Sequence, residues 1–289
     1  MESPRFCHGI PSGITSIGAG GCAWTLPWAD GCFAGGDMVR RPAGRERLER
    51  DEVRVWTAVP ESIDDPVVLD AYEVLESGDE RARRLRLHFD RDRHERLVSN
   101  ALVRTTLSRY ADVEPGKWVF ERNEHGRPDP ASGQCELPLR YNLSHTKGLV
   151  ACAVTLGREI GVDVECIERR GDAVAIADRY FAPAECRELR ACPAERRRER
   201  FFEYWTLKES YIKARGLGLR IPLRRFAFHL AEGHPIRISF DAELEDDACD
   251  WQFALFRPEP THVMAVAVRR GRGPDLTIRV RRSPVRNPG

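Results

Sequence analysis

Lysine and long apolar runs are scarce in this 289-residue chain. Nearly all basic residues are arginine, and the only lysines are Lys117, Lys147, Lys208 and Lys213. No apolar run approaches the roughly 18 residues that a membrane-spanning helix needs. Because the formal net charge is only +1, composition favours neither a nucleic acid nor an anionic membrane as partner. The length allows one large domain or two modest ones.

Paired cysteine motifs and a targeting segment are also missing. The nine cysteines, an odd number, show no paired CxxC or Cys/His ligand spacing, which predicts mostly reduced thiols in a cytoplasmic protein. Residues 1–48 are rich in Gly, Pro and Ser and lack a basic stretch before an apolar core. They predict a flexible N-terminal extension rather than a signal peptide. Residues 271–289 predict a basic C-terminal tail with one weak strand over Leu276–Val280.

The rest of the chain alternates helical and strand patterns. Strands are expected over Val53–Ala58, Trp118–Glu121, Val150–Leu156, Ile160–Glu165, Phe226–Leu230, Ile236–Phe240, Trp251–Phe256 and Val263–Val268. Helices are expected over Asp79–Leu87, Asp90–Tyr110, from Asp172 to before Pro183, over Ala184–Leu189 and from Phe201. Tight loops are expected at Asn123–Pro130 and around Ser144–Thr146.

Two charged residues break the apolar pattern of the helix expected from Phe201. Its aromatic and aliphatic residues form one arc, yet Lys208 falls near the middle of that arc and Glu209 lies at its border. Glu209 and Lys213 have the spacing of an ordinary surface pair, worth about 0.2–0.5 kcal/mol. Since charged residues seldom face a core without partners, the helix also fits a functional site. Gly216 and Gly218 are expected to end it.

A second set of charges lies on the strand Ile160–Glu165. Asp163 and Glu165 alternate with valines and therefore point to the same face, about 7 Å apart. Taken alone, this pattern is more typical of an exposed polar face. Together with Glu209, the two carboxylates give an oxygen-only ligand set that suits Mg²⁺, or Mn²⁺, rather than zinc. Lys208, Lys213, His145 and Arg127 would supply cations for a diphosphate. The residues predict metal-dependent chemistry on a diphosphate and leave the substrate open.

Four motifs in order resemble one enzyme family. They are HGRPDP at His125–Pro130, YNLSHTKG at Tyr141–Gly148, GVDVE at Gly161–Glu165 and WTLKESYIKARGLGL at Trp205–Leu219. Together they resemble the 4′-phosphopantetheinyl transferase family, and most closely the broad-specificity type that activates surfactin synthetase and other secondary-metabolite carriers. The resemblance covers roughly residues 52–270.

The resemblance implies an α+β fold made of a pseudo-twofold pair of similar subdomains, residues 49–155 and 156–270, with the active site in the cleft between them. It implies transfer of the phosphopantetheine arm from coenzyme A to a serine of an apo acyl or peptidyl carrier protein of fatty-acid, polyketide or peptide biosynthesis. Adenosine 3′,5′-bisphosphate would be released. No nucleic acid or membrane partner is expected, and the protein is expected to be a monomer.

The resemblance also implies roles for residues. Asp163, Glu165 and Glu209 would hold Mg²⁺, and Glu209 or a metal-bound water would accept the serine proton. The catalytic set would be Glu209, Asp163, Lys213, Lys208 and His145. The coenzyme A site would include Arg83, Arg96, Gly126, Arg127, Pro128, Ser144, His145, Thr146, Asp163 and Lys213.

Two positions depart from the family pattern. Arg127 stands where the family often has lysine, and Glu80 stands where the resemblance leads us to expect a basic residue near the 3′-phosphate. Two other functions use similar residues: a Mg²⁺-dependent nucleotide-diphosphate hydrolase, and a coenzyme A-binding protein without turnover. An assay with coenzyme A, Mg²⁺ and apo carriers would separate the three.

Overall fold

The structure is a computed structural model that describes residues 46–169, 173–218 and 221–283, which belong to one compact unit spanning residues 41–289. Most of the predicted N-terminal extension lies outside the described residues. Its last residues are packed, however: Leu48 is a buried core residue, and Glu46 contacts Arg109. Glu46 and Leu48, which the sequence analysis placed in the extension, therefore pack against the N-terminal half.

Helices and strands of the described residues have the following bounds. The helices are α1 (Pro66–Leu75), α2 (Gly78–Leu85), α3 (Asp90–Ser108), α4 (Ala173–Tyr180), α5 (Pro183–Ala191) and α6 (Ala194–Arg215), with short 3-10 turns at η1 (Pro60–Ser62), η2 (Pro115–Lys117), η4 (Leu223–Arg225) and η5 (Ala248–Asp250). The strands are β1 (Glu52–Ala58), β2 (Phe120–Arg122), β3 (Pro128–Pro130), β4 (Leu139–Thr146), β5 (Leu149–Leu156), β6 (Ile160–Cys166), β7 (Phe226–His229), β8 (Arg237–Phe240), β9 (Trp251–Phe256), β10 (His262–Arg269) and β11 (Thr277–Arg282).

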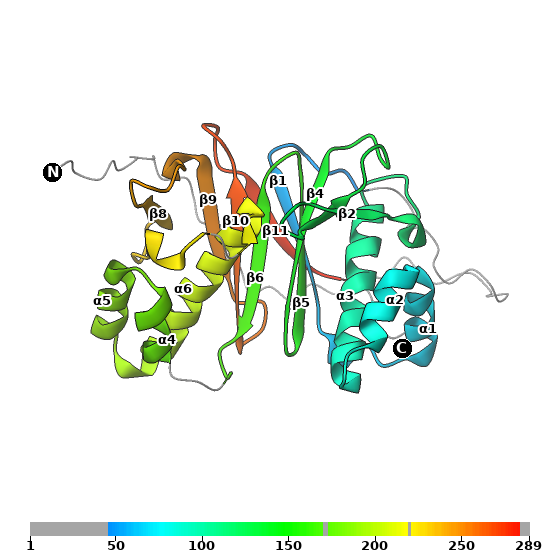
Figure 1. The fold of residues 1–289 in the computed structure, drawn as a ribbon, viewed down its shortest axis with the longest axis horizontal. Helices are drawn as coiled ribbons and strands as arrows, with labels where there is room; N and C mark the ends of the chain where they lie inside the picture. Colours follow the sequence, from blue (N-terminus) through cyan, green and yellow to red (C-terminus); the bar gives the residue numbers. More distant parts are fainter. Residues whose placement is uncertain (1–45, 170–172, 219–220, 284–289) are drawn as a thin grey trace, which may run out of the picture. The chain divides into compact units, whose positions relative to one another are not determined.

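Of the four sheets in the described residues, the two larger ones lie between two groups of helices (Figure 1), and β2-β3 and β7-β8 are two-stranded. One sheet has the order β11-β1-β5-β4 and is covered by α1–α3; the other has the order β6-β10-β9 and is covered by α4–α6. An apolar layer joins the sheets, with Val55 and Ala153 on one side and Val162 and Val266 on the other. Each half thus combines a sheet with one long helix, α3 or α6. The α+β class predicted from the sequence is confirmed.

The strand β11 changes the expected domain boundaries. It pairs in parallel with β1, with Glu52 opposite Thr277 and Thr57 opposite Arg282, and it forms the edge of the N-terminal sheet. The segment expected to be a basic tail therefore contributes a strand, and the N-terminal half is completed by residues from the far end of the chain. Residues 284–289 lie outside the described part.

Local sequence signals account for several element ends. Asp65 caps α1 through the Val67 amide, and Pro66 fills its first turn, where no amide donor is required. Ser77 and Glu80 form a capping box at α2. Gly216 ends α6 with a φ of 63°, a conformation that glycine adopts without strain.

The sequence analysis missed α1 and placed parts of two motifs in loops although they are strands. Pro128–Pro130, the end of the expected tight loop, forms β3 and pairs with β2. Residues Ser144–Thr146, expected in a loop, belong to strand β4, where they pair with Leu149–Ala151 of β5. The long helix begins at Ala194 instead of Phe201. Its first turns are polar, so the apolar pattern that revealed the helix starts only later.

No helix in the described ranges is both long and apolar enough to cross a lipid bilayer.

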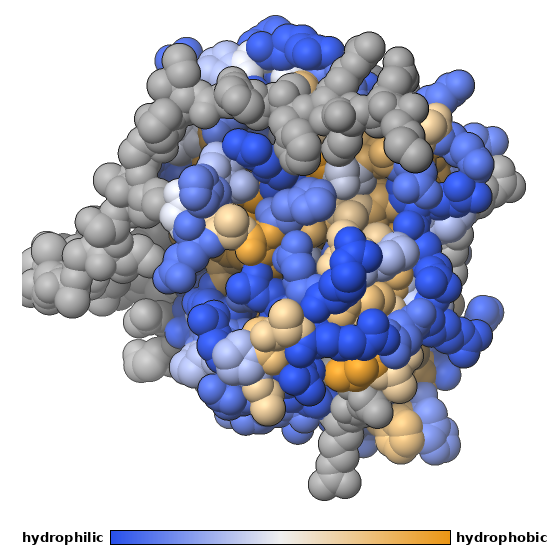
Figure 2. All heavy atoms as spheres, turned by 90° about the vertical axis from the view of Figure 1, so that its left-hand side faces the viewer, coloured by the Kyte–Doolittle hydropathy of each residue, from blue (hydrophilic) through white to orange (hydrophobic). Residues whose placement is uncertain are grey.

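Figure 2 views the side on which α4 and α5 lie in Figure 1, and hydrophobic residues there form patches between hydrophilic ones. Tyr180, at the end of α4, is among the exposed large hydrophobic residues.

Candidate active site

Helix α6 lies unusually close to strand β6, and Gly161 allows this approach. A Cβ built on Gly161 would stand 1.9 Å from the Ser210 carbonyl oxygen and 2.5 Å from the Ala214 amide nitrogen. Only a residue without a side chain fits between a strand and a helix backbone at this distance. The following residues on the same strand face, Asp163 and Glu165, are thereby placed beside α6.

Asp163 is the centre of a buried polar cluster. The Lys213 Nζ donates to Asp163 Oδ1 at 2.6 Å and to Ser144 Oγ at 2.8 Å. Ser144 Oγ in turn donates to Asp163 Oδ1 at 3.0 Å, and Asp163 is only 5% exposed. Strand β4, strand β6 and helix α6 therefore each contribute one side chain, and the cluster lies where the two halves of the molecule meet.

The two other predicted carboxylates lie within electrostatic range of Asp163. Burial and the Asp163 charge raise the pKa of Glu165 to about 7, partly offset by Arg169 and Lys213. Burial and the Asp163 charge also raise the pKa of Glu209, and Lys213 opposes this. Three carboxyl groups thus lie near two cations, Lys213 and Arg169, and the excess negative charge disfavours their full ionisation.

The residues fit a hard cation in their chemistry, although no ready-made ligand cage is present. Asp163 Oδ2 is buried and has no hydrogen-bond partner, while Oδ1 is held by Lys213 and Ser144. Within the described residues, no three His, Cys, Asp or Glu side chains are already arranged to hold a metal ion. An unpartnered carboxylate oxygen beside two carboxyls with raised pKa values is what a divalent cation would neutralise.

Polar side chains of β4 hold the edge of β6. Asn142 Oδ1 accepts a hydrogen bond from the Val162 amide at 2.9 Å, and Ser144 Oγ accepts one from the Val164 amide at 3.3 Å. These contacts satisfy backbone donors of β6 that no strand pairs on that side. Asn142 was not among the predicted site residues. The sequence could have indicated Asn142, because it lies two residues before Ser144 in the YNLSHTKG motif and therefore on the same face of the strand.

His145 lies beside this cluster but does not serve as a cation. Its side chain is 37% exposed, and its Nε2 lies 3.4 Å from Glu95 Oε1. Partial desolvation, Arg96 and Lys213 lower its pKa to about 4, although this exposure works against so large a shift. At neutral pH the imidazole is therefore uncharged. The sequence analysis counted His145 among the cations for a diphosphate; the lowered pKa favours a hydrogen bond from the neutral ring instead.

We expect the His145 ring to titrate near pH 4 and to show no protonation step between pH 6 and 8. NMR of the histidine Cε1 protons measures this, with a His145→Gln variant to assign the signal. Since the folded-state pKa is lowered, the unfolded chain binds the proton more tightly between about pH 4 and 6.5, and stability falls as the pH drops through that window. A midpoint near 6.5 would contradict the described environment.

Lys208 does not reach the acidic cluster. Its side chain is fully buried, its Nζ lies 2.8 Å from Glu185 Oε2, and it donates to the carbonyls of Leu223 and Phe226. Glu185 also accepts from the Phe228 amide, so both charges are saturated within the protein. The catalytic role predicted for Lys208 is therefore not supported by its position. A buried lysine needs a negatively charged partner, and here that partner is Glu185, which the sequence analysis did not identify.

Arg127 is likewise committed inside the protein. Its guanidinium is nearly buried and donates to main-chain carbonyls at the end of α6 and on β4. It is not free to serve as the phosphate cation that the sequence predicts. The neighbouring Gly126 is exposed and Pro128 is half-buried, so the backbone of this loop remains accessible.

The other predicted coenzyme A residues lie on the N-terminal half. Arg83 is exposed on α2, Arg96 is partly exposed on α3, and Thr146 is partly exposed at the end of β4. Arg96 is close enough to lower the pKa of His145, which places a positive charge beside the cluster. Glu80 caps α2 and binds the buried Arg104, with the closest contact at 2.6 Å. That structural role explains an acidic residue at this position.

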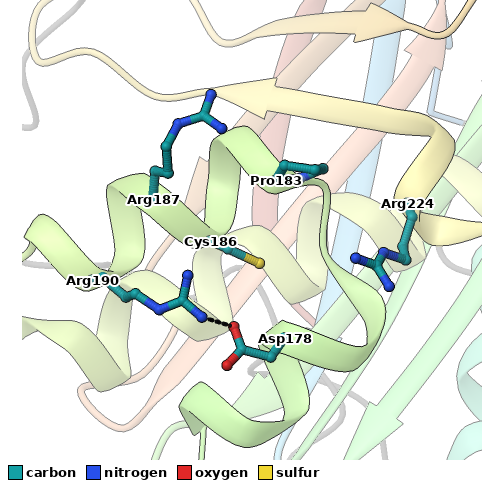
Figure 3. Close-up of a pocket in the computed structure, with 6 residues that line it drawn as sticks. All are labelled: Asp178, Pro183, Cys186, Arg187, Arg190 and Arg224. Atoms are coloured by element: carbon teal, nitrogen blue, oxygen red, sulfur yellow. Dashed lines mark hydrogen bonds and ion pairs between the residues drawn. The ribbon is translucent and has the colours of Figure 1, made fainter.

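A cavity of about 390 Å³ lies elsewhere, between α4, α5 and η4 (Figure 3). Its lining includes Cys186 and three arginines, of which Arg190 is paired with Asp178. The predicted catalytic residues are not among those that line it. Five cysteines of the described part are free thiols, namely Cys135, Cys152, Cys166, Cys186 and Cys192, whereas Cys249 is disulfide-bonded.

Comparison with known proteins identifies the family. A family model described as the 4′-phosphopantetheinyl transferase superfamily matches residues 159–267, and one described as 4′-phosphopantetheinyl transferase, N-terminal, matches residues 65–156. The 4′-phosphopantetheinyl transferase HetI from Nostoc sp. is 34% identical over 221 residues, which cover 76% of this chain and 89% of HetI. The chain belongs to the 4′-phosphopantetheinyl transferase superfamily. The protein is thus an enzyme, a transferase.

Another relative of this transferase agrees with the family assignment. The 4′-phosphopantetheinyl transferase Sfp from Bacillus subtilis is 30% identical over 193 residues, which cover 66% of this chain and 80% of Sfp. A solved holo-[acyl-carrier-protein] synthase from Thermotoga maritima matches 42% of this chain and 64% of its own, with 23% identity and a TM-score of 0.31.

Proposed function

We propose that this transferase moves the 4′-phosphopantetheine arm of coenzyme A to a serine hydroxyl of an apo acyl or peptidyl carrier protein. Adenosine 3′,5′-bisphosphate is the second product. The observation that carries the proposal is the cluster at the junction of the two halves, in which Lys213 binds Asp163 and Ser144 beside Glu165 and Glu209. The similarity to the 4′-phosphopantetheinyl transferases HetI and Sfp supports the transfer of this group. Carriers of secondary metabolism are proposed as substrates because the four motifs resemble the broad-specificity type.

The reaction is an in-line displacement at phosphorus. The serine oxygen forms a bond to the phosphorus that carries the pantetheine arm, and the bridging P–O bond breaks to release the nucleotide. Such a step depends on positioning and charge neutralisation more than on covalent help. Lys213 offers its ammonium to a phosphate oxygen, and His145 offers an uncharged ring as a hydrogen-bond donor.

Glu209 is proposed to accept the serine proton. Its raised pKa brings the carboxylate closer to the operating pH, which favours a general base. Asp163, Glu165 and Glu209 would hold Mg²⁺ or Mn²⁺, which would neutralise charge on the diphosphate when bound. Asp163 additionally holds Lys213 in place through Oδ1.

Intact-mass spectrometry of a panel of apo carriers, incubated with the protein, coenzyme A and Mg²⁺, tests this proposal. We expect each accepted carrier to gain one phosphopantetheine group, and a carrier with the acceptor serine changed to alanine to gain none. We expect EDTA to stop the reaction and Mg²⁺ or Mn²⁺ to restore it.

Two outcomes would contradict the proposal. Cleavage of coenzyme A while all carriers stay unmodified would indicate a hydrolase. Binding of coenzyme A with no product in any reaction would indicate a binding protein without turnover. Full transfer in metal-free buffer would support the transferase activity but show that the reaction does not depend on a metal ion.

A further inference from the structure

Arg127 lies at the C-terminal end of α6, the helix that carries Glu209 and Lys213. Its Nη1 donates to the main-chain carbonyls of Lys213 and Ala214, both at 2.8 Å. Its Nη2 donates to the Tyr141 carbonyl on β4 at 3.2 Å. One side chain from the loop between β2 and β3 therefore joins the end of α6 to the strand that carries Ser144.

The end of a helix needs such donors, because its last carbonyls have no partner within the helix. The Gly216 amide serves the carbonyls of Ile212 and Lys213, and Arg127 supplies donors for Lys213 and Ala214. A cation is also favoured at this end by the helix dipole. The guanidinium thus completes the last turn of α6.

Asn123 makes a second contact of the same kind. Its Nδ2 donates to the Gly216 carbonyl at 3.1 Å, and its Oδ1 accepts from the Arg127 amide at 2.9 Å. A Cβ on Gly216 would come within 3.1 Å of Arg127 Cδ, so the loop is packed directly against the helix end. The loop and α6 therefore behave as one packed unit.

The side chain is arginine for a geometric reason. Its two terminal nitrogens reach carbonyls on two separate elements, whereas a lysine offers a single nitrogen. Arg127 is 8% exposed, which leaves little room for a phosphate beside it. Burial lowers its pKa, and Asp129 opposes this from 3.8 Å.

We propose that Arg127 is a positioning residue. It fixes the end of α6 against β4, so that Lys213 stays on Asp163 and Ser144, and it does not itself contact coenzyme A. The inference rests on the proposed function for its kinetic consequence, but the structural part can be measured without any substrate.

An Arg127→Lys variant tests the proposal, because it keeps the positive charge and removes the two terminal guanidinium nitrogens that reach α6 and β4. We expect kcat to fall on the order of 10- to 100-fold through misplacement of Lys213, with KM for coenzyme A changed less than about twofold. By hydrogen–deuterium exchange, we expect the amides of Ile212–Gly216 to exchange roughly 10-fold faster.

Arg158→Lys is the matched control. Arg158 also donates to three main-chain carbonyls, those of Arg50, Arg269 and Arg270, and none of these lies on α6. We expect this variant to keep wild-type kcat and wild-type exchange at the end of α6, even where its melting temperature falls.

Three results would overturn the proposal. One is a rise in KM for coenzyme A at unchanged kcat in an Arg127→Ala variant, which would mark a phosphate contact. The others are wild-type kcat in Arg127→Lys and unchanged exchange at Ile212–Gly216. If the wild-type protein transfers nothing to any carrier, the proposed function fails, and the exchange data still decide the role of Arg127.

Asn123→Asp keeps the proposal testable if the Arg127 variants fail to fold. This change replaces the donor to Gly216 by a charged oxygen that repels the Gly216 carbonyl, and it leaves the buried guanidinium in place. We expect the same faster exchange at the end of α6 and the same fall in kcat, both smaller than for Arg127→Lys. Wild-type behaviour in both measurements would count against the loop as a support for α6.

Discussion

Replacing Glu209 by glutamine is expected to lower transfer to a saturating apo carrier on the order of 10²–10⁴-fold. Glutamine has nearly the same shape but cannot accept the serine proton or neutralise a cation. Burial and the Asp163 charge raise the pKa of Glu209, so removing its negative charge relieves both desolvation and repulsion. The melting temperature is therefore expected to stay the same or rise slightly.

A surface pair between Glu209 and Lys213 makes the opposite prediction. Losing such a pair would cost a few tenths of a kcal/mol in stability and nothing in rate. Glu203→Gln is the control on the same helix, since Glu203 pairs with Arg200 and Arg257 away from the cluster. We expect Glu203→Gln to keep its rate within about twofold. Turnover and thermal melting of both variants, measured side by side, decide between the two roles.

The parts of this site that follow from local patterns could be predicted from the sequence. Alternation along β6 places Asp163 and Glu165 on one face, and the apolar arc of α6 places Glu209 at its border. Gly216 ends the helix as expected. These features depend on residues close together in the chain, where the periodicity of helix and strand is sufficient.

The roles of the cations could not be predicted, because each depends on a partner distant in the sequence. Lys208 is neutralised by Glu185 on α5, and Arg127 is used by carbonyls of α6 and β4. Both residues occur within motifs that suggested direct contact with substrate. A motif shows that a residue type is required at a position, but it does not show whether the requirement is chemical or structural.

The pairing of β11 with β1 was also beyond the sequence pattern. A weak strand near the end of the chain shows no sign of which edge it joins, and its arginines suggested a solvated tail. Helix α1 is different. Asp65 and Pro66 are typical of the start of a helix, and the sequence analysis did not use them. The pairing of β11 was missed because it is long-range, whereas α1 could have been predicted.

Gly161→Ala is expected to be the most damaging single change to the fold around the site. The added Cβ would meet the Ser210 carbonyl oxygen at 1.9 Å and the Ala214 amide at 2.5 Å. Both are backbone atoms of α6, so no side chain can rotate away and the helix must move off β6. Overpacking of a core typically costs about 1–3 kcal/mol, and a backbone clash this short is expected to exceed about 3 kcal/mol.

The same shift separates Lys213 and Glu209 from Asp163, so transfer is expected to be lost together with stability. Urea denaturation gives the free energy of unfolding, and the mass assay gives the rate. Gly78→Ala is the control, because a Cβ at Gly78 has no atom within 4 Å and alanine suits a helix. If Gly161→Ala unfolds within about 1 kcal/mol of the wild type, below the usual cost of overpacking, α6 cannot lie as close to β6 as described. The geometry that brings the three carboxyl groups together would then be wrong.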